Sequence, residues 1–232
     1  MLSNEVQTSW LPNGEFSLCL VLETNHSNPK HDIPVIIQRL VLQLRQVAKL
    51  EHDIIPGQDS ITIVAGNDES LLYLKQQLEL LLLNLPEHEQ FESTIHELAI
   101  CYDERLSTDL GELSQRLCLD REAIIKRHLM GTYRLDMLGF LPGFFYLSGL
   151  HKSLILTRKD TPSVQVPKGS VAIAEQMCGI YSLPSPGGWW TIGRTPDQLF
   201  DINKTPPVTI SPLDEIRFKP ICYEQFLEFN HD

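Results

Sequence analysis

The segment spanning residues 131–150 constrains the fold of this chain more than any other. It reads GTYRLDMLGFLPGFFYLSGL, and a second run of similar composition, SPGGWWTIGRTP, occupies residues 185–196. Glycine gives the backbone access to positive φ and to close approach, whereas proline fixes φ and removes a hydrogen-bond donor. Both residues weaken a regular strand, so a β-rich region that contains them must bend sharply. Such bends, crowded with aromatic side chains, are typical of a chain that builds a pocket.

Composition limits the class of protein. A length of 232 residues fits one large domain or two small ones, and 42% hydrophobic with 21% charged residues is ordinary for a folded soluble protein. The formal net charge is −11, and no cluster of lysine and arginine appears in the sequence. Nucleic-acid binding needs clustered positive charge, so we expect no nucleic-acid partner.

The cysteines and the N-terminus indicate a cytoplasmic location. The five cysteines are scattered, none forms a CxxC pair, and no Cys/His group has zinc-ligand spacing. Reduced thiols in a reducing compartment are the simplest interpretation. The first residues lack the charged and apolar regions of a signal peptide, and the apolar run at 78–85 is too short to cross a bilayer. We therefore expect no membrane association and no bound metal.

The first 90 residues predict a small α+β domain. A compact apolar run predicts a buried strand at 16–22, and a proline at position 34 opens a helix that extends to residue 48. A hairpin is expected over 54–64, and a second, leucine-rich helix over 70–85 ends at a proline. This order favours two helices on one face of a sheet. The polar segment 86–90 is the most linker-like part of the chain.

Residues 91–232 predict a second, mainly β domain. A strand is expected at 94–102, followed by two short helices at 109–117 and 121–129. Asp109 and Glu112 have the spacing of a capping box, and Asp120 is a suitable N-cap for the second helix. After Tyr133 the pattern changes to short β segments punctuated by glycine and proline, which is typical of a small barrel or sandwich.

Several side chains near the two unusual segments are candidates for a small-molecule site. Phe140 and Phe144 lie among glycine and proline and could form apolar walls, although aromatic side chains more often fill a core. Arg158 and Arg194 could hold a carboxylate or phosphate, whereas a surface ion pair is an equally good interpretation of Arg158.

Four further residues are ambiguous from the residue pattern alone. His128 stands at a predicted helix C-terminus, where the dipole favours a capping imidazolium, but Tyr133 follows closely and general acid–base chemistry is the alternative. Gln176 and Tyr181 face either solvent or a cavity. No P-loop, GxGxxG, HExxH or GxSxG motif is present. The residue pattern alone therefore predicts only a two-domain cytosolic protein with a small-molecule pocket.

The unusual segments carry a family resemblance. The sequence from His128 through GFLPGFFYLSGL, VPKGSVAIA at 166–174, SPGGW at 185–189 and IGRTP at 192–196 closely resembles the family of 5-oxoprolinase B subunits, also known as the KipI or allophanate hydrolase subunit 1 family. The resemblance implies an N-terminal α+β domain followed by a cyclophilin-like β-barrel. It also implies membership of an ATP-dependent complex that opens 5-oxoproline to L-glutamate, with a homologue of the 5-oxoprolinase C subunit and an A subunit as partners.

The resemblance also implies roles for individual residues. His128, Tyr133, Gln176 and Arg194 are expected to be catalytic, and Phe140, Phe144, Arg158 and Tyr181 to bind substrate. ATP is expected to be used by the complex. The chain departs from the family pattern at Phe145, Thr157, Ser163, Glu175 and Ser182, and Ser163 replaces an arginine expected in the family.

Two other functions compete with the enzyme component. Some relatives bind and inhibit histidine kinases, so a KipI-like regulatory protein is the main alternative. Half of a biotin-dependent carboxyltransferase is a weaker one, because no biotinyl-lysine tract is present. Retention of the four expected catalytic residues favours the enzyme, and we expect the isolated chain to have no activity.

Overall fold

The computed structural model describes residues 6–24, 32–48, 52–84 and 93–229. The chain divides into two compact units, residues 1–92 and residues 93–232, and each is described by itself. The segment that the sequence predicted as a linker, residues 86–90, lies outside the described residues. None of the described helices is both long enough and apolar enough to span a bilayer.

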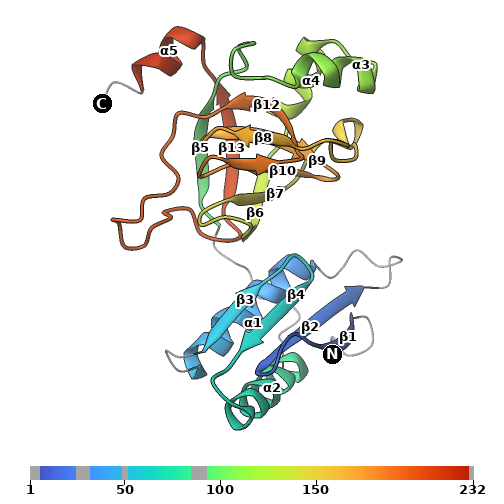
Figure 1. Ribbon diagram of the computed structural model, residues 1–232, viewed down its shortest axis with the longest axis vertical. Coiled ribbons are helices and arrows are strands. Elements are labelled where there is room, and N and C mark those ends of the chain that lie inside the picture. The colour runs from blue at the N-terminus through green and yellow to red at the C-terminus, as the bar shows by residue number, and fades with distance from the viewer. Residues whose placement is uncertain (1–5, 25–31, 49–51, 85–92, 230–232) are drawn as a thin grey trace. The chain divides into compact units, whose positions relative to one another are not determined.

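The N-terminal unit is a four-stranded antiparallel sheet covered by two helices (Figure 1). The strands lie in the order β1-β2-β4-β3. Their bounds, with those of the helices, are β1 Val6–Pro12, β2 Ser17–Thr24, α1 Ile33–Val47, β3 Asp53–Pro56, β4 Ser60–Val64 and α2 Asp68–Leu83. Strands β2, β3 and β4 and both helices were predicted, and the structure confirms them. Strand β1 was not predicted.

One apolar face of this sheet packs against both helices. Leu20 of β2 lies opposite Ile61 of β4, so their side chains project from the same face. Both are fully buried in one cluster with Leu40 of α1 and Leu74 of α2. Helix α2 begins at Asn67, whose side chain accepts a hydrogen bond from the Ser70 N–H at 2.8 Å. The packing therefore follows the helical and strand periodicities of the sequence.

The C-terminal unit is built on a seven-stranded mixed sheet that curls into a half-barrel (Figure 1). The strand order is β12-β9-β10-β7-β6-β13-β5, in which only the β13–β5 pair is parallel, and β11 and β8 form a separate two-stranded sheet. The elements are β5 Ile95–Ile100, α3 Leu110–Leu117, α4 Arg121–Leu129, β6 Tyr133–Leu138, β7 Phe145–Ser148, the 3-10 turn η2 Lys152–Leu154, β8 Ser163–Val166, β9 Ser170–Ala174, β10 Met177–Ile180, β11 Ser185–Gly187, β12 Trp190–Arg194, β13 Glu215–Pro220 and α5 Tyr223–Glu228. The structure therefore confirms the mainly β character that was predicted for the segment after Tyr133.

The two edges of the curled sheet meet at one seam. Cys101, which follows β5, and Arg194, which ends β12, exchange backbone hydrogen bonds of 2.8 Å and 3.0 Å. Gly193 makes this approach possible. A Cβ atom at position 193 would lie 2.9 Å from the Cys101 carbonyl oxygen and 3.1 Å from Ile100 Cγ1. Only a residue without a side chain leaves the two edges at this separation.

Gly193→Ala is expected to destabilise the C-terminal unit by about 1–3 kcal/mol, because the added methyl group must push apart two backbone segments of a packed barrel. Urea unfolding measures this change, and Gly111→Ala is the matched control in the same unit, because a Cβ there meets nothing within 4 Å. Equal loss of stability in both variants would contradict the proposed role of the seam.

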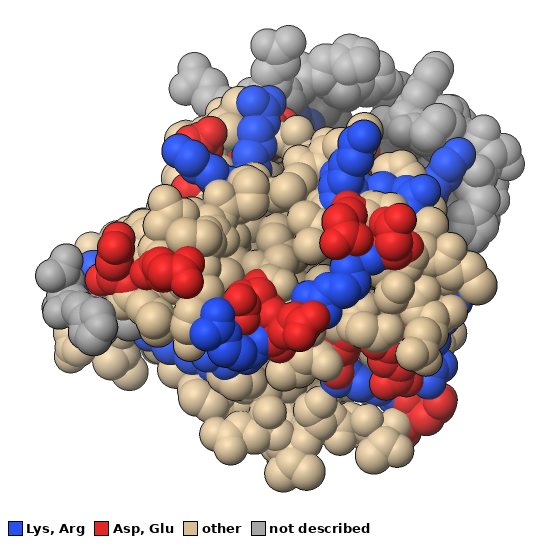
Figure 2. Space-filling model, turned by 90° about the horizontal axis from the view of Figure 1, so that it is seen from above, with Lys and Arg blue, Asp and Glu red and all other residues tan. Residues whose placement is uncertain are grey.

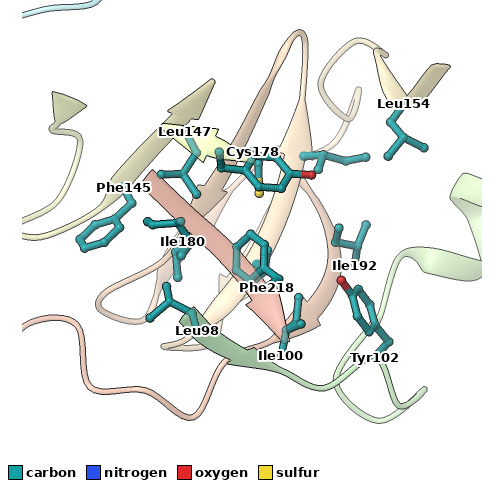
Figure 3. Close-up of a cluster of buried hydrophobic side chains, with 14 of the residues drawn as sticks. Leu98, Ile100, Tyr102, Phe145, Leu147, Leu154, Cys178, Ile180, Ile192 and Phe218 are labelled. Atoms are coloured by element: carbon teal, nitrogen blue, oxygen red, sulfur yellow. The ribbon is translucent and has the colours of Figure 1, made fainter. Parts of the chain in front are cut away.

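Side chains from all parts of the curled sheet converge on one core (Figure 3). Leu98 and Phe218 reach it from the parallel pair, and Phe145, Cys178 and Ile192 reach it from the antiparallel strands (Figure 3). The core continues under helices α3 and α4 through buried side chains, namely Leu110, Leu113 and Ile124. This packing fixes which strand residues are left to face outward.

The two short helices begin differently from one another. Asp120 accepts a hydrogen bond from the Ala123 N–H at 2.6 Å, which confirms the predicted N-cap. The capping box predicted at Asp109 is wrong, because this side chain makes no cap bond. Its carboxylate instead accepts from Lys159 Nζ at 2.5 Å and from the Thr191 N–H at 2.7 Å. A tertiary ion pair has replaced the local interaction.

Charge is mixed on the face shown in Figure 2, where acidic and basic side chains alternate around an uncharged hollow. The negative net charge is therefore not gathered into one patch on the described part of that face.

Candidate functional site

The alternation of side chains along β7 separates the core from a second aromatic cluster. Phe145 and Leu147 point into the barrel core, whereas Phe144 and Tyr146 belong to the cluster on the other side of the sheet. Phe144 lies edge-on to Tyr181, with ring centroids 4.9 Å apart, and to Trp189 at 5.8 Å. Edge-to-face packing of this kind favours a fixed geometry for the rings.

These rings line a cavity of about 260 Å³. The wall combines aromatic rings, two prolines, two glycines and one arginine: Phe140, Phe144, Tyr146, Arg158, Pro162, Tyr181, Pro186, Gly187, Gly188 and Trp189. An apolar hollow with a few aimed polar groups is the usual form of a small-molecule site. We take this cavity as the candidate functional site.

The sharp bend predicted in the glycine-rich segment forms one rim of the cavity. Phe140 has a φ of 62°, a left-handed conformation that is uncommon for a bulky residue, and the residue is 61% exposed. The strained backbone presents this ring edge-on to Phe144 at 5.5 Å. Backbone strain of this kind is found at functional sites more often than elsewhere.

Tyr181 supplies a hydroxyl group to the cavity, and its ring lies edge-on to that of Phe140, with ring centroids 6.4 Å apart. A Cβ at position 187 would lie 2.2 Å from the Tyr181 hydroxyl oxygen, so glycine is needed there for the ring to fit. Burial, followed by the charge of Tyr146, raises the pKa of Tyr181 to about 12. The hydroxyl is therefore protonated at neutral pH and acts as a hydrogen-bond donor.

Arg158 is the cation among the cavity-lining residues. Its Nε lies 3.1 Å from a carboxylate oxygen of Glu175, and both side chains are more than half exposed, at 58% and 59%. An exposed pair of this kind contributes little stability. The remaining N–H groups of the guanidinium are a suitable fork for a ligand carboxylate.

A largely buried ion pair holds the Arg158 loop against the neighbouring turn. The ammonium of Lys159 contacts the Asp109 carboxylate at 2.5 Å and the Ser163 hydroxyl at 2.8 Å, and its backbone N–H donates to the Gly188 carbonyl at 2.8 Å. Asp109 also accepts from the Thr191 N–H of β12. This one carboxylate thus connects both loops that carry cavity residues.

The structure brings together the residues that were expected to bind substrate and separates them from those expected to be catalytic. Phe140, Phe144, Arg158 and Tyr181 all line the cavity. His128, Tyr133, Gln176 and Arg194 do not line it.

His128 lies in the centre of the barrel core and is fully buried. Its Nδ1 is 2.7 Å from the Tyr102 hydroxyl, and its Nε2 is 3.5 Å from the Cys178 sulfur. A neutral ring satisfies both contacts when the tyrosine donates to Nδ1 and Nε2–H donates to sulfur. Burial lowers the pKa of His128 to about 3. The Tyr133 hydroxyl donates to the His128 carbonyl at 2.9 Å, so both residues brace the core in this structure.

Gln176 and Arg194 lie in two other places. Gln176 is exposed in the tight turn between β9 and β10, where the preceding Glu175 has a φ of 55°. Arg194 ends β12 at the barrel seam. Within the described part of the chain, no cluster of three or more His, Cys, Asp or Glu side chains could hold a metal ion.

Sequence reasoning missed part of the cavity. Tyr146, Pro162 and Trp189 line it but were not chosen as binding residues. The alternation after Phe144 could have identified Tyr146, because residues two apart on a strand share a face. Nothing local identifies Pro162, which reaches the cavity through the long loop between η2 and β8.

Comparison with known proteins places this architecture among carboxyltransferase-type domains. The family described as "Carboxyltransferase domain, subdomain C and D" matches residues 11–210. The Kluyveromyces lactis urea carboxylase structure superimposes with a TM-score of 0.72 over 95% of this chain and 22% of that one, at 18% identity, and so shows the fold alone. The chain therefore belongs to the carboxyltransferase-domain family of subdomains C and D.

Within this family, the similarity extends to named enzyme components. The 5-oxoprolinase B subunit of Bacillus subtilis is 33% identical over 159 residues, which are 68% of this chain and 66% of the relative. The crystal structure of TTHA0988 superimposes with a TM-score of 0.70 at 28% sequence identity. The matched region is 93% of this chain and 40% of that one. The chain thus spans less than half of that solved structure.

Proposed function

We propose that this chain is the B subunit of an ATP-dependent 5-oxoprolinase complex and that its aromatic cavity binds the lactam substrate. The observation that carries the proposal is the convergence of Phe140, Phe144, Arg158 and Tyr181 on one cavity. All four were expected from the sequence to bind substrate. The similarity to 5-oxoprolinase B subunits agrees with this proposal.

The polar groups of the cavity match the groups of 5-oxoproline. The substrate has a small ring, one carboxylate and one lactam carbonyl. The Arg158 guanidinium is suited to the carboxylate, and the neutral Tyr181 hydroxyl is suited to the carbonyl oxygen, where negative charge develops as the amide is attacked. The rings of Phe144 and Trp189 enclose the apolar part of the ring and exclude water.

The cavity residues do not fit ATP. A triphosphate needs several cations or a cradle of backbone N–H groups, whereas Arg158 is the cation among the lining residues and Glu175 already faces it. We therefore assign nucleotide binding to another component of the complex. The C and A subunits are the proposed partners, and this chain supplies the substrate pocket.

Reconstitution tests the proposed function. The chain is mixed with the C and A subunits of the same source, and ATP-dependent release of glutamate from 5-oxoproline is measured. We expect turnover that requires all three proteins and none with this chain alone. Stable assembly without turnover would contradict the substrate, and failure to assemble would favour the regulatory alternative.

Arg158→Gln in the reconstituted complex is expected to lower kcat/KM by roughly 10- to 100-fold, since a charge-assisted hydrogen bond to a carboxylate contributes about 1.5–3 kcal/mol. Steady-state kinetics with 5-oxoproline measures the loss. Arg127→Gln is the matched control, because it removes the same charge from α4, outside the cavity. If Arg158→Gln leaves kcat/KM for 5-oxoproline unchanged, Arg158 does not bind the substrate.

A further inference from the structure

Arg194 has no hydrogen-bond or ion-pair partner for its guanidinium among the described residues. The side chain is half-buried, and its Nε atom is buried without an acceptor. Burial lowers the pKa of Arg194 from its usual value, which agrees with a cation that has lost water without gaining a carboxylate. The nearest acidic residue along the chain, Asp197, is already engaged by the Ala99 N–H at 2.8 Å and the Thr195 hydroxyl at 3.0 Å.

A second unpaired polar group lies beside this arginine. Ser170 of β9 is directly opposite Arg194 in the ladder, so the two side chains project from the same face of the sheet. The Ser170 side chain is fully buried, and its hydroxyl has no partner within the described structure. Buried polar groups are nearly always paired, so two neighbouring exceptions call for a partner from outside the described chain.

The surrounding backbone shapes this position. Gly169 has a φ of 79°, and a Cβ there would lie 2.3 Å from the Thr195 carbonyl oxygen and 3.3 Å from Arg194 Cγ. The arginine stem therefore packs directly on the glycine turn. Lys168, the residue before this turn, is exposed and adds a second positive charge close by along the chain.

We propose that Arg194 and Ser170 form a binding site for a small oxyanion, a carboxylate or a phosphate group, at the barrel seam. The site is separate from the aromatic cavity, since neither residue lines that cavity. A planar guanidinium binds both oxyanions through paired N–H donors, and a serine hydroxyl adds one donor. The proposal does not depend on the 5-oxoprolinase function.

Thermal unfolding and calorimetric titration of the intact chain test this site, with inorganic phosphate and acetate as separate probes. We expect at least one anion to raise Tm and to bind with measurable heat. Arg194→Gln should weaken that binding by about tenfold or more, whereas Arg116→Gln, which removes an exposed arginine already paired with Glu112, should leave it unchanged. If only phosphate binds, the site takes a phosphate group. If only acetate binds, the site takes a carboxylate.

Ser170→Ala provides a second test, which remains informative if the Arg194→Gln variant folds poorly. Removing an unpaired buried hydroxyl should leave Tm unchanged or higher without anion, while anion binding weakens. If Ser170 had only a structural role, Ser170→Ala would not weaken anion binding while leaving Tm unchanged or higher. Absence of binding by either anion, or equal binding by wild type and Arg194→Gln, would overturn the proposal.

Discussion

Acidification from pH 7 to pH 5 is expected to destabilise the C-terminal unit by roughly 2 kcal/mol through His128 alone. The pKa of this imidazole is about 3 in the folded protein, because burial opposes its charge, and about 6.5 when the chain is unfolded. Between these values the unfolded state binds more protons, so stability falls as pH decreases. Over the whole window the loss is on the order of 4 kcal/mol.

His128→Gln removes this titration and should flatten the dependence of unfolding free energy on pH between 5 and 7. Urea unfolding at several pH values measures it, in a Trp10→Phe background so that tryptophan fluorescence reports the C-terminal unit, which holds the other two tryptophans. His151→Gln is the control, since His151 is not fully buried. The same pH slope in wild type and His128→Gln would contradict a neutral core histidine.

Asp109→Ala should destabilise the C-terminal unit by about 3 kcal/mol or more. The substitution leaves the ammonium of Lys159, whose side chain is only 10% exposed, without its carboxylate, and it takes the Asp109 acceptor from the Thr191 N–H. An uncompensated buried charge is among the most costly defects that a single substitution creates. The loss should appear as a lower urea midpoint with little change in slope.

A double-mutant cycle separates the ion pair from the other contacts of Asp109. Adding Lys159→Met to Asp109→Ala removes the stranded charge and should recover part of the lost stability. The interaction energy should exceed about 1 kcal/mol. Additivity within about 0.5 kcal/mol would mean that the pair does not brace the two loops.

The fold could be predicted where local pattern and tertiary packing agree. Helices α1 and α2 show apolar residues at helical spacing, and Asp120 needs only the next three residues to act as a cap. Strand β1 was missed because it lies at the sheet edge and its residues 7–9 are polar and exposed, so no apolar alternation marks it. Asp109 was misjudged because Lys159, fifty residues away, competes for its carboxylate.

The site could be predicted in part for the same reason. Glycine, proline and aromatic residues in one segment indicate a bent cavity wall, and four of the predicted residues lie there. His128 could not be placed from sequence, because its position inside the core depends on Tyr102, which follows β5, and on Cys178 of β10, both distant in the sequence. A histidine next to a pocket motif in sequence need not face the pocket in space.

Fluorine NMR of the reconstituted complex, with 5-fluorotryptophan in this chain alone, tests the central claim most directly. The chain has three tryptophans, of which Trp189 lines the cavity, Trp190 donates its indole N–H to the Thr157 carbonyl at 2.8 Å, and Trp10 lies in the N-terminal unit. We predict that 5-oxoproline shifts the Trp189 resonance in a saturable manner, leaves Trp10 unchanged, and loses this effect in Arg158→Gln. Saturable binding of 5-oxoproline by the complex without a change at Trp189 would contradict the proposed cavity.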